Sequence, residues 1–155
     1  MNGLSDLIAP EAILPRLPAT TRKQALQAMA DTLSKAAGVN ARAVFDAVLI
    51  RERLSGTGLG EGVAVPHASV PGVTHPIGAF ARLETPIDFD ALDARPADLV
   101  FMLISSPEKG ADHLKALARV SRFFRRADMR ERLRAARGMD ELAALFASNV
   151  HSDAA

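Results

Sequence analysis

An uninterrupted apolar run from Leu99 to Ile104 places the strongest constraint on how this chain of 155 residues folds. The run is too short to cross a bilayer, and continuous apolar sequence of this kind is typical of a strand buried on both faces. Ser105-Ser106-Pro107 follows and ends it. We therefore expect a central strand over residues 98–104, with other strands and helices packed around it.

Capping residues predict two helices ahead of this strand. Thr21 is a candidate N-cap with Gln24 three residues later, as in a capping box, and Gly38 ends the apolar periodicity. Asn40 can cap a second helix that ends near Leu54. The chain therefore begins its regular structure with two consecutive helices.

The remaining segments complete an α/β pattern. Residues 1–18 contain Pro10, Pro15 and Pro18, so we expect this segment to be an irregular lead-in. We expect strands over 63–65, 78–83 and 87–89, the last at a sheet edge where Pro86 is tolerated, and helices over 111–126, 128–136 and 139–149. This order indicates a single α/β domain over residues 1–155, with a mixed β-sheet sandwiched between helices. Its core covers about residues 7–148, and we expect 1–6 and 149–155 to be frayed.

Composition excludes several classes of protein. Hydrophobic residues make up 48% and charged residues 24%, which is typical of a soluble globular chain. The absence of cysteine excludes disulfides, thiol catalysis and cysteine-based metal sites. The net charge of +1 gives no overall attraction to nucleic acid or to anionic membranes. No segment is apolar enough for membrane insertion, and the N-terminus lacks the basic residues of a secretory signal, so we expect a cytoplasmic protein.

His67 is the strongest candidate for chemistry. It follows a strand-like run and Pro66, whose fixed φ makes the chain rigid at that point. Residues 56–62 read Gly-Thr-Gly-Leu-Gly-Glu-Gly, and such a turn allows backbone N–H groups to approach an anion. The candidate phosphoryl-cradling positions in this turn are Thr57, Gly58, Gly60 and Gly62.

His113 and Arg51 are the candidate partners of His67. His113 falls in the first turn of the helix after the central strand, where the helix dipole favours a neutral ring that donates one N–H. In open α/β sheets ligands bind beyond the strand ends, so loop placement lets both histidines reach one crevice. A neutral imidazole there can attack a phosphoryl group, while His113 and the Arg51 guanidinium stabilise its oxygens.

Each of these features also has an ordinary structural interpretation. A Pro-His pair can simply end a strand, a histidine in a first helical turn can cap it, and Arg51 can form a surface ion pair. The glycine turn matches neither a Walker A motif nor a dinucleotide fingerprint, and no metal-ligand spacing is present.

A basic segment offers a competing interpretation. Eight arginines lie between Arg119 and Arg137, offset only by Asp128 and Glu131, which raises the possibility of nucleic-acid binding. Their alternation with apolar residues (Phe123, Phe124, Met129 and Leu133) indicates amphipathic helices with one solvated side instead. An acidic protein partner, or steering of anionic phosphoryl donors, is the preferred use of this face, and no nucleic acid is expected.

Two stretches resemble a known family. Residues 51–67 (Arg-Glu-Arg-Leu-Ser-Gly-Thr-Gly-Leu-Gly-Glu-Gly-Val-Ala-Val-Pro-His) resemble the active-site motif of the fructose/mannitol-type IIA domains of the bacterial phosphotransferase system. Residues 111–118 (Ala-Asp-His-Leu-Lys-Ala-Leu-Ala) resemble the second-histidine motif of the same family. The resemblance runs from about residue 7 to 148, and the single-domain length is similar to the nitrogen-regulatory branch. The chain departs from the family in having Ala68-Ser69 after His67.

The resemblance implies roles, partners and a fold. His67 would be the phosphorylated histidine, His113 its active-site neighbour and Arg51 the stabilising arginine, with no cofactor. The donor would be a histidine-phosphocarrier protein charged from phosphoenolpyruvate, and the output would be control of partners such as potassium-transport or sensor proteins. The family fold is a mixed sheet between helices. Two alternatives stay open: a sugar-specific IIA component that passes phosphate to a separate IIB protein, and a non-catalytic regulatory binding module.

Overall fold

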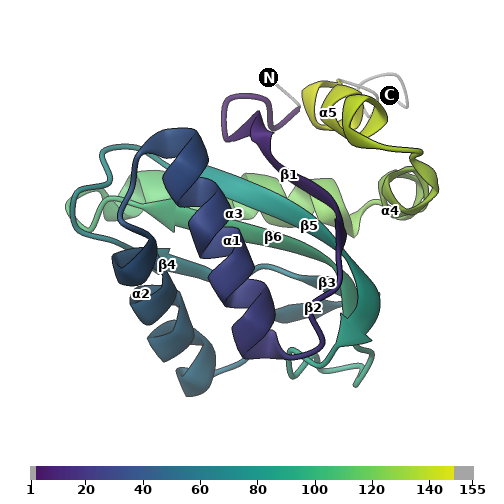
Figure 1. Ribbon diagram of the computed structural model, residues 1–155, viewed down its shortest axis with the longest axis horizontal. Helices are drawn as coiled ribbons and strands as arrows, with labels where there is room; N and C mark the ends of the chain where they lie inside the picture. Colours follow the sequence, from purple (N-terminus) through teal and green to yellow (C-terminus); the bar gives the residue numbers. More distant parts are fainter. Residues whose placement is uncertain (1–2, 149–155) are drawn as a thin grey trace.

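The computed structural model describes residues 3–148 and forms one α/β unit (Figure 1). In chain order the elements are β1 (Ile8–Leu17), α1 (Arg22–Ala37), α2 (Ala41–Leu54), β2 (Gly58–Gly60), β3 (Val63–Ala64), β4 (His67–Ser69), β5 (Ile77–Ile87), β6 (Ala97–Ser105), α3 (Gly110–Arg125), α4 (Ala127–Ala135) and α5 (Met139–Ala147).

Strand β6 lies at the centre of a mixed sheet of order β1-β5-β6-β3-β2. It pairs antiparallel with β5 on one side and parallel with both β3 and β4 on the other. Every residue of β6 except Asp98 is buried. The expected central strand is therefore confirmed, because each of its faces lies under other elements.

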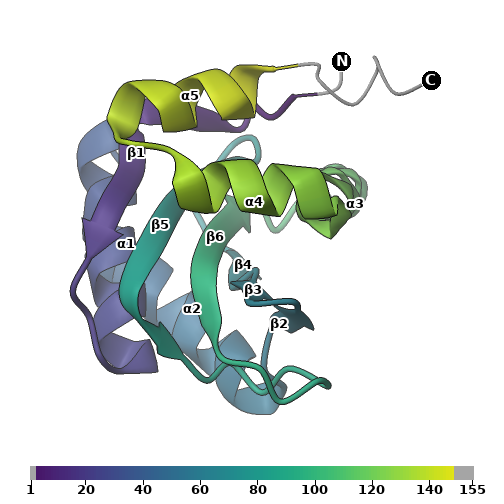
Figure 2. The ribbon, with the colours of Figure 1, turned by 90° about the vertical axis from the view of Figure 1, so that its right-hand side faces the viewer.

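Helices cover both faces of this sheet, as the sequence predicts. Figure 1 shows α1 and α2 together on one face, and Figure 2 shows α3 and α4 on the opposite face. Helix α5 packs beside β1 at one edge. The sheet is thus sandwiched between helices.

The first two helices begin and end where their caps predict. The Thr21 hydroxyl accepts the N–H of Gln24 at 3.1 Å, and Gly38 ends α1 with a left-handed φ of 74°. The Asn40 side chain accepts the N–H of Ala43 at 2.9 Å. These caps satisfy backbone groups that would otherwise lack partners at the helix ends.

The expectation of an irregular N-terminal lead-in is wrong. Residues 8–17 form β1, an edge strand that pairs with β5. Prolines are tolerated there because one side of an edge strand makes no hydrogen bonds to a neighbouring strand. Residues 3–6 are not frayed either: Leu4 is 1% exposed and its N–H donates to the Phe146 carbonyl at 2.7 Å. The expected fraying of residues 149–155, and of residues 1 and 2, lies outside the described residues.

Other strand boundaries also differ from expectation. The strand expected over 78–83 extends to Ile87 as one strand, β5, with a register shift between Arg82 and Ile87, and it lies between β1 and β6, so no separate edge strand forms over 87–89. Strands β2 and β4 are short and were not predicted. Strand β4 becomes a strand by pairing with the distant β6, whereas β2 pairs with the neighbouring β3 in a tight hairpin whose glycines do not suggest a strand.

An aromatic cluster fills the space between the sheet and the C-terminal helices. Phe80 of β5 lies 4.9 Å from Phe146 of α5, and Phe101 of β6 lies 5.9 Å from Phe124 of α3, measured between ring centroids. Gly78 makes room for this cluster, because a Cβ at that position would overlap the Phe101 ring. The packing of α3 and α5 on the sheet therefore depends on one missing side chain.

Substituting Gly78 with alanine should destabilise the fold. The added methyl group forces the Phe101 ring out of the cluster, and overpacking of this kind costs about 1–3 kcal/mol of unfolding free energy. Urea unfolding followed by circular dichroism measures the change. Gly110→Ala is the matched control, since no atom lies within 4 Å of the corresponding position and alanine favours the helix. Equal stability of the two variants would contradict the packing argument.

Candidate active site

The pleat of the sheet directs His67 toward α3. Strand β4 pairs with β6 in a register that sets His67 opposite Leu103 and Ser69 opposite Ser105. Side chains alternate along a strand, so Leu103 and Ser105 share the face of Phe101, which packs against α3. His67 therefore lies on the face of the sheet that α3 covers.

A backbone hydrogen bond fixes the His67 ring. Its Nδ1 lies 2.8 Å from the Val65 carbonyl oxygen. A carbonyl only accepts, so Nδ1 carries the proton and the lone pair of Nε2 is left for chemistry. The Pro66 carbonyl in turn accepts the N–H of Leu103 at 2.9 Å, which ties this segment to β6.

His113 stands beside His67, as loop placement predicts. It lies in the first turn of α3, and the two ring centroids are 5.5 Å apart with a tilt of 42°. The Nδ1 of His113 is hydrogen-bonded to the hydroxyl of Ser105, a residue with no exposed surface. The end of the central strand thus positions the second histidine.

Burial favours the neutral form of both imidazoles. It is the largest cause that lowers the pKa of His67 below its usual value. The hydrogen bond to Val65 opposes this shift and the positive charge of Arg51 adds to it. Burial also lowers the pKa of His113, and repulsion from a charged His67 contributes. Neutral rings are the state in which one nitrogen of each keeps a free lone pair.

Arg51 lies within electrostatic reach of this pair. It occupies the last turn of α2, which packs on β4 (Figure 1). Its guanidinium donates to the Ser55 carbonyl at 2.8 Å, and its charge acts on His67. The structure therefore brings His67 and His113 together from two elements, and the positive charge of Arg51, on a third, acts on His67.

The expected phosphoryl cradle does not form from the glycine turn. The N–H of Thr57 donates to Glu52 at 3.0 Å, and the N–H of Gly58 donates to the Phe89 carbonyl at 3.0 Å. Neither amide is available to an anion.

The other two glycines lie too far along the sheet. Gly60 pairs with Val63, whose partner on β6 is Leu99, and the Gly62 carbonyl accepts the N–H of Leu99 at 3.1 Å. His67 pairs at Leu103, which is about 13 Å further along β6 at 3.3 Å per residue. The glycines serve the β2–β3 hairpin, and Gly60 and Gly62 adopt left-handed φ values of 93° and 79° in it.

Three groups that act on the histidines were missed from the sequence. These are the Val65 carbonyl, the Ser105 hydroxyl and the buried Glu52 carboxylate. Ser105 was noted only as the end of the strand run. Its role depends on the register of β4 and β6, which no local pattern specifies.

The arginine-rich segment consists of amphipathic helices, as expected. Its apolar residues are buried, namely Phe123, Phe124, Met129 and Leu133. Arg119 pairs with Asp6 at 2.7 Å, and Arg126 pairs with Asp128 at 2.6 Å. Much of the positive charge is therefore held by partners within the chain.

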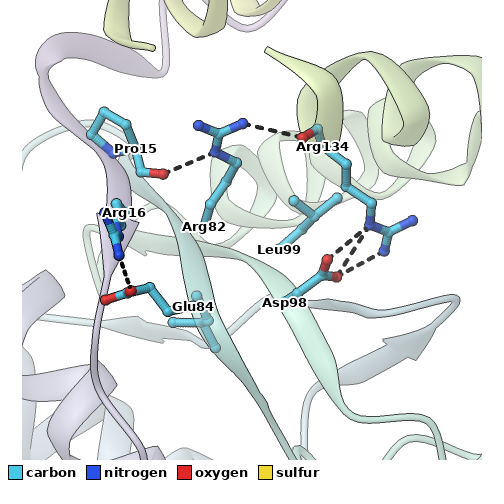
Figure 3. Close-up of a pocket in the computed structure, with 8 residues that line it drawn as sticks. Pro15, Arg16, Arg82, Glu84, Asp98, Leu99 and Arg134 are labelled. Carbon is cyan, nitrogen blue, oxygen red and sulfur yellow. Dashed lines mark hydrogen bonds and ion pairs between the residues drawn. The ribbon is translucent and has the colours of Figure 1, made fainter. Parts of the chain in front are cut away.

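Figure 3 shows a cavity of about 240 Å³ that three arginines border, two of which, Arg82 and Arg134, connect α4 with the sheet. Arg82 donates to the backbone carbonyl of Pro15 at 2.9 Å and to that of Arg134 at 3.4 Å. Arg134 pairs with Asp98 at 2.9 Å. The cavity is lined by Leu99 and so lies toward the opposite end of β6 from the histidine pair. These arginines fasten α4 to the sheet and do not belong to the histidine site.

Within residues 3–148, no group of three or more histidine or carboxylate side chains is arranged to hold a metal ion. No helix in the same range is long and apolar enough to cross a membrane.

Comparison with known proteins gives a consistent result. The family "Phosphoenolpyruvate-dependent sugar phosphotransferase system, EIIA 2" matches residues 6–149. The nitrogen regulatory protein of Bradyrhizobium diazoefficiens is 47% identical over 144 residues, which cover 93% of this chain and 94% of that protein.

Solved structures have the same fold. The nitrogen regulatory protein IIA-Ntr from Neisseria meningitidis superposes with a TM-score of 0.84 at 29% identity, covering 92% of this chain and 97% of that one. The mannitol IIA enzyme of Escherichia coli, solved in complex with phosphorylated mannitol IIB, gives a TM-score of 0.76 at 25% identity, with coverage of 91% and 99%. With the family match over nearly its full length, this chain belongs to the EIIA type-2 family of the phosphoenolpyruvate-dependent sugar phosphotransferase system.

Proposed function

We propose that this chain is a cytoplasmic regulatory phosphocarrier that accepts a phosphoryl group on Nε2 of His67. The observation that carries the proposal is the geometry of His67. Its ring is neutral, fixed through Nδ1 to the Val65 carbonyl at 2.8 Å, and set 5.5 Å from the ring of His113.

The transfer requires no proton to move. The donor is a phosphohistidine on a small phosphocarrier protein. Its N–P bond breaks and the donor nitrogen keeps the bonding electron pair, while the Nε2 lone pair of His67 forms the new N–P bond. The ring becomes more positive as it attacks, which strengthens the bond from Nδ1–H to the Val65 carbonyl.

His113 and Arg51 stabilise the transferred group. When the Ser105 hydroxyl donates to Nδ1 of His113, the proton of that ring stays on Nε2 and can be donated to a phosphoryl oxygen. Arg51 supplies positive charge for the oxygens that carry most of the negative charge in the transition state.

The surface around the site suits a protein donor. Ile50 and Leu54, on the helix that carries Arg51, are 61% and 78% exposed. Leu114, next to His113 on α3, is 66% exposed. Exposed apolar side chains on the two helices that carry Arg51 and His113 favour a surface that binds another protein.

The nitrogen-regulatory relatives favour a regulatory output over sugar uptake. In this proposal the phosphorylated and unphosphorylated forms bind different regulatory targets, such as potassium-transport or sensor proteins. Phosphorylation adds about −1.5 to −2 charges, which changes the exposed face around His67 without requiring a change of fold. The mannitol IIA structure with phosphorylated IIB supports the second candidate, a sugar-specific component that serves a separate IIB protein.

Replacing His67 should abolish phosphorylation. Incubation with phosphoenolpyruvate and the upstream phosphocarriers should give the wild-type chain an acid-labile mass gain, and His67→Ala should gain nothing. Normal incorporation in His67→Ala would assign the acceptor elsewhere. Adding a fructose-type IIB protein to the phosphorylated chain then separates the two candidates: retained phosphate supports the regulatory carrier, and rapid discharge supports the sugar-specific component.

Replacing His113 should slow transfer without unfolding the chain. Loss of one positioned donor typically costs about 10²–10³ in rate, so His113→Ala should show a decrease of that order in rapid-quench measurements. His113→Gln should recover part of it, because its amide also donates an N–H. A rate for His113→Ala equal to that of wild type would show that the ring takes no part.

The neutral histidines should make the fold sensitive to mild acid. Their pKa values are lowered in the folded chain, so the unfolded chain binds more protons below its own histidine pKa of about 6.5. Stability is therefore full above that pH and falls as the pH drops below it towards the lowered pKa values of the folded chain. Urea unfolding should show a smaller decrease in His67→Gln than in wild type. His75→Gln, at an exposed position, is the control, and equal decreases in all three chains would contradict the shift.

A further inference from the structure

Glu52 is a buried carboxylate that the transfer chemistry does not itself use. It follows Arg51 in the last turn of α2, and its side chain is 1% exposed. A carboxylate is seldom buried to this extent unless hydrogen-bond donors compensate for the lost hydration. The groups that donate hydrogen bonds to Glu52 therefore indicate the role of its buried charge.

Two of those donors belong to a single residue, Thr57. The Thr57 N–H donates to Oε2 of Glu52 at 3.0 Å, and its hydroxyl donates to Oε1 at 2.6 Å. Arg22 of α1 approaches Oε2 at 3.5 Å from another side. Glu52 thus fixes both the backbone and the side chain of Thr57 just after α2 ends.

The hydrogen bonds continue from Thr57 to His67. The Thr57 carbonyl accepts the N–H of Val65 at 3.0 Å. The Val65 carbonyl then accepts Nδ1–H of His67 at 2.8 Å. Pro66 has no N–H, so it adds no donor of its own between these two residues. The direction of the Val65 carbonyl consequently depends on how Thr57 is held.

That direction matters because it selects the tautomer of His67. Free histidine prefers the proton on Nε2, which would block the nitrogen that attacks phosphorus. The Val65 carbonyl accepts only from a protonated Nδ1, so its placement keeps the Nε2 lone pair available.

We propose that Glu52 and Thr57 are positioning residues that hold His67 in its reactive Nδ1–H tautomer through Val65. The inference rests on the proposed function of His67 as the phosphoryl acceptor. The set of Glu52, Thr57 and Val65 is called the Glu52 network below.

The experiment compares three changes in the full chain. Thr57→Val removes the hydroxyl that donates a hydrogen bond to Oε1 of Glu52, while it keeps a side chain of similar size. Thr57→Ser restores the hydroxyl. Thr32→Val is the matched control, because it removes a threonine hydroxyl bonded to the Ala28 carbonyl at 2.9 Å within α1.

Two measurements are made on each variant. Long-range ¹⁵N–¹H NMR at about pH 8, above the histidine titration, reports which ring nitrogen of His67 carries the proton. Rapid-quench kinetics with the phosphorylated histidine-phosphocarrier protein reports the transfer rate. We expect the Nδ1–H form in wild type, Thr57→Ser and Thr32→Val. In Thr57→Val we expect a mixture with the Nε2–H form and a rate lower by about tenfold, comparable to the loss of other groups that orient a histidine.

Glu52→Gln separates the charge from the hydrogen bonds. Its amide oxygen can accept the Thr57 N–H and its amide nitrogen can donate to the Thr57 hydroxyl, so the tautomer should be kept. The Glu52 charge acts to raise the pKa of His67, so NMR titration should show a lower pKa in this variant.

The outcomes are distinct. Retention of the Nδ1–H tautomer and the wild-type rate in Thr57→Val would overturn the proposal, as would an equal effect of Thr32→Val. Loss of thermal stability in Thr57→Val with an unchanged tautomer would also overturn it, since the hydroxyl would then only stabilise the fold. The tautomer measurement needs no phosphoryl donor. If Thr57→Val shifts the tautomer but the chain never accepts phosphate, the positioning role of the Glu52 network is supported and only the proposed function is rejected.

Discussion

The parallel pairing of β4 with β6 is the constraint on which the site depends. Three residue pairs define it, with His67 opposite Leu103 at one end and Ser69 opposite Ser105 at the other. A shift of one residue would turn the His67 side chain to the face covered by α1 and α2, away from His113. Central strand β6 fixes this register because its apolar side chains are buried on both faces. A slip of β4 against β6 would require the side chains on both faces of the sheet to repack.

The same strand supplies both halves of the histidine pair. Leu103 donates its N–H to the Pro66 carbonyl and so holds the chain just before His67. Ser105, two residues further and on the same face, binds the ring of His113. The relative position of the rings is therefore set by the spacing of residues along one rigid strand, although the histidines come from separate elements. A site built on a strand end is more accurately placed than one built on a loop alone.

The elements that the sequence predicts correctly are those that depend on local chemistry. Thr21, Gly38 and Asn40 act within a few residues of their own helix, so α1 and α2 were placed correctly, and the apolar run identified β6. Strand β1 was missed because its prolines indicate irregular chain, whereas its edge position makes them harmless. Long-range pairing with β6 defines β4, and β2 was missed because its glycines indicate a turn, although it pairs with β3 in a local hairpin.

The same distinction between local and long-range determinants applies to the candidate site. His67, His113 and Arg51 could be named as candidates because each carries chemistry in its own side chain. The glycine turn was assigned the wrong role because its flexibility was taken to mean free amides, yet pairing with Glu52 and the Phe89 carbonyl uses the amides of Thr57 and Gly58. Glu52 was overlooked because a glutamate in a helix is normally solvated, and only the folded chain shows that it is buried.

The charges of Arg51 and Glu52 shift the pKa of His67 in opposite directions, which suits the proposed role of a histidine that accepts a phosphoryl group and passes it on. Burial disfavours any charge on the ring, so a free lone pair is retained. In the proposed function Arg51 would attract the negative phosphoryl group, whereas the buried Glu52 carboxylate, held by Thr57, would repel it. If Arg51 acted alone, the phosphorylated state would be stabilised without opposition and release would be slower. The buried negative charge of Glu52 would reduce that stabilisation, while its hydrogen bonds to Thr57 would, as we propose, orient the ring. On this proposal one carboxylate would both orient the histidine and keep its reaction reversible.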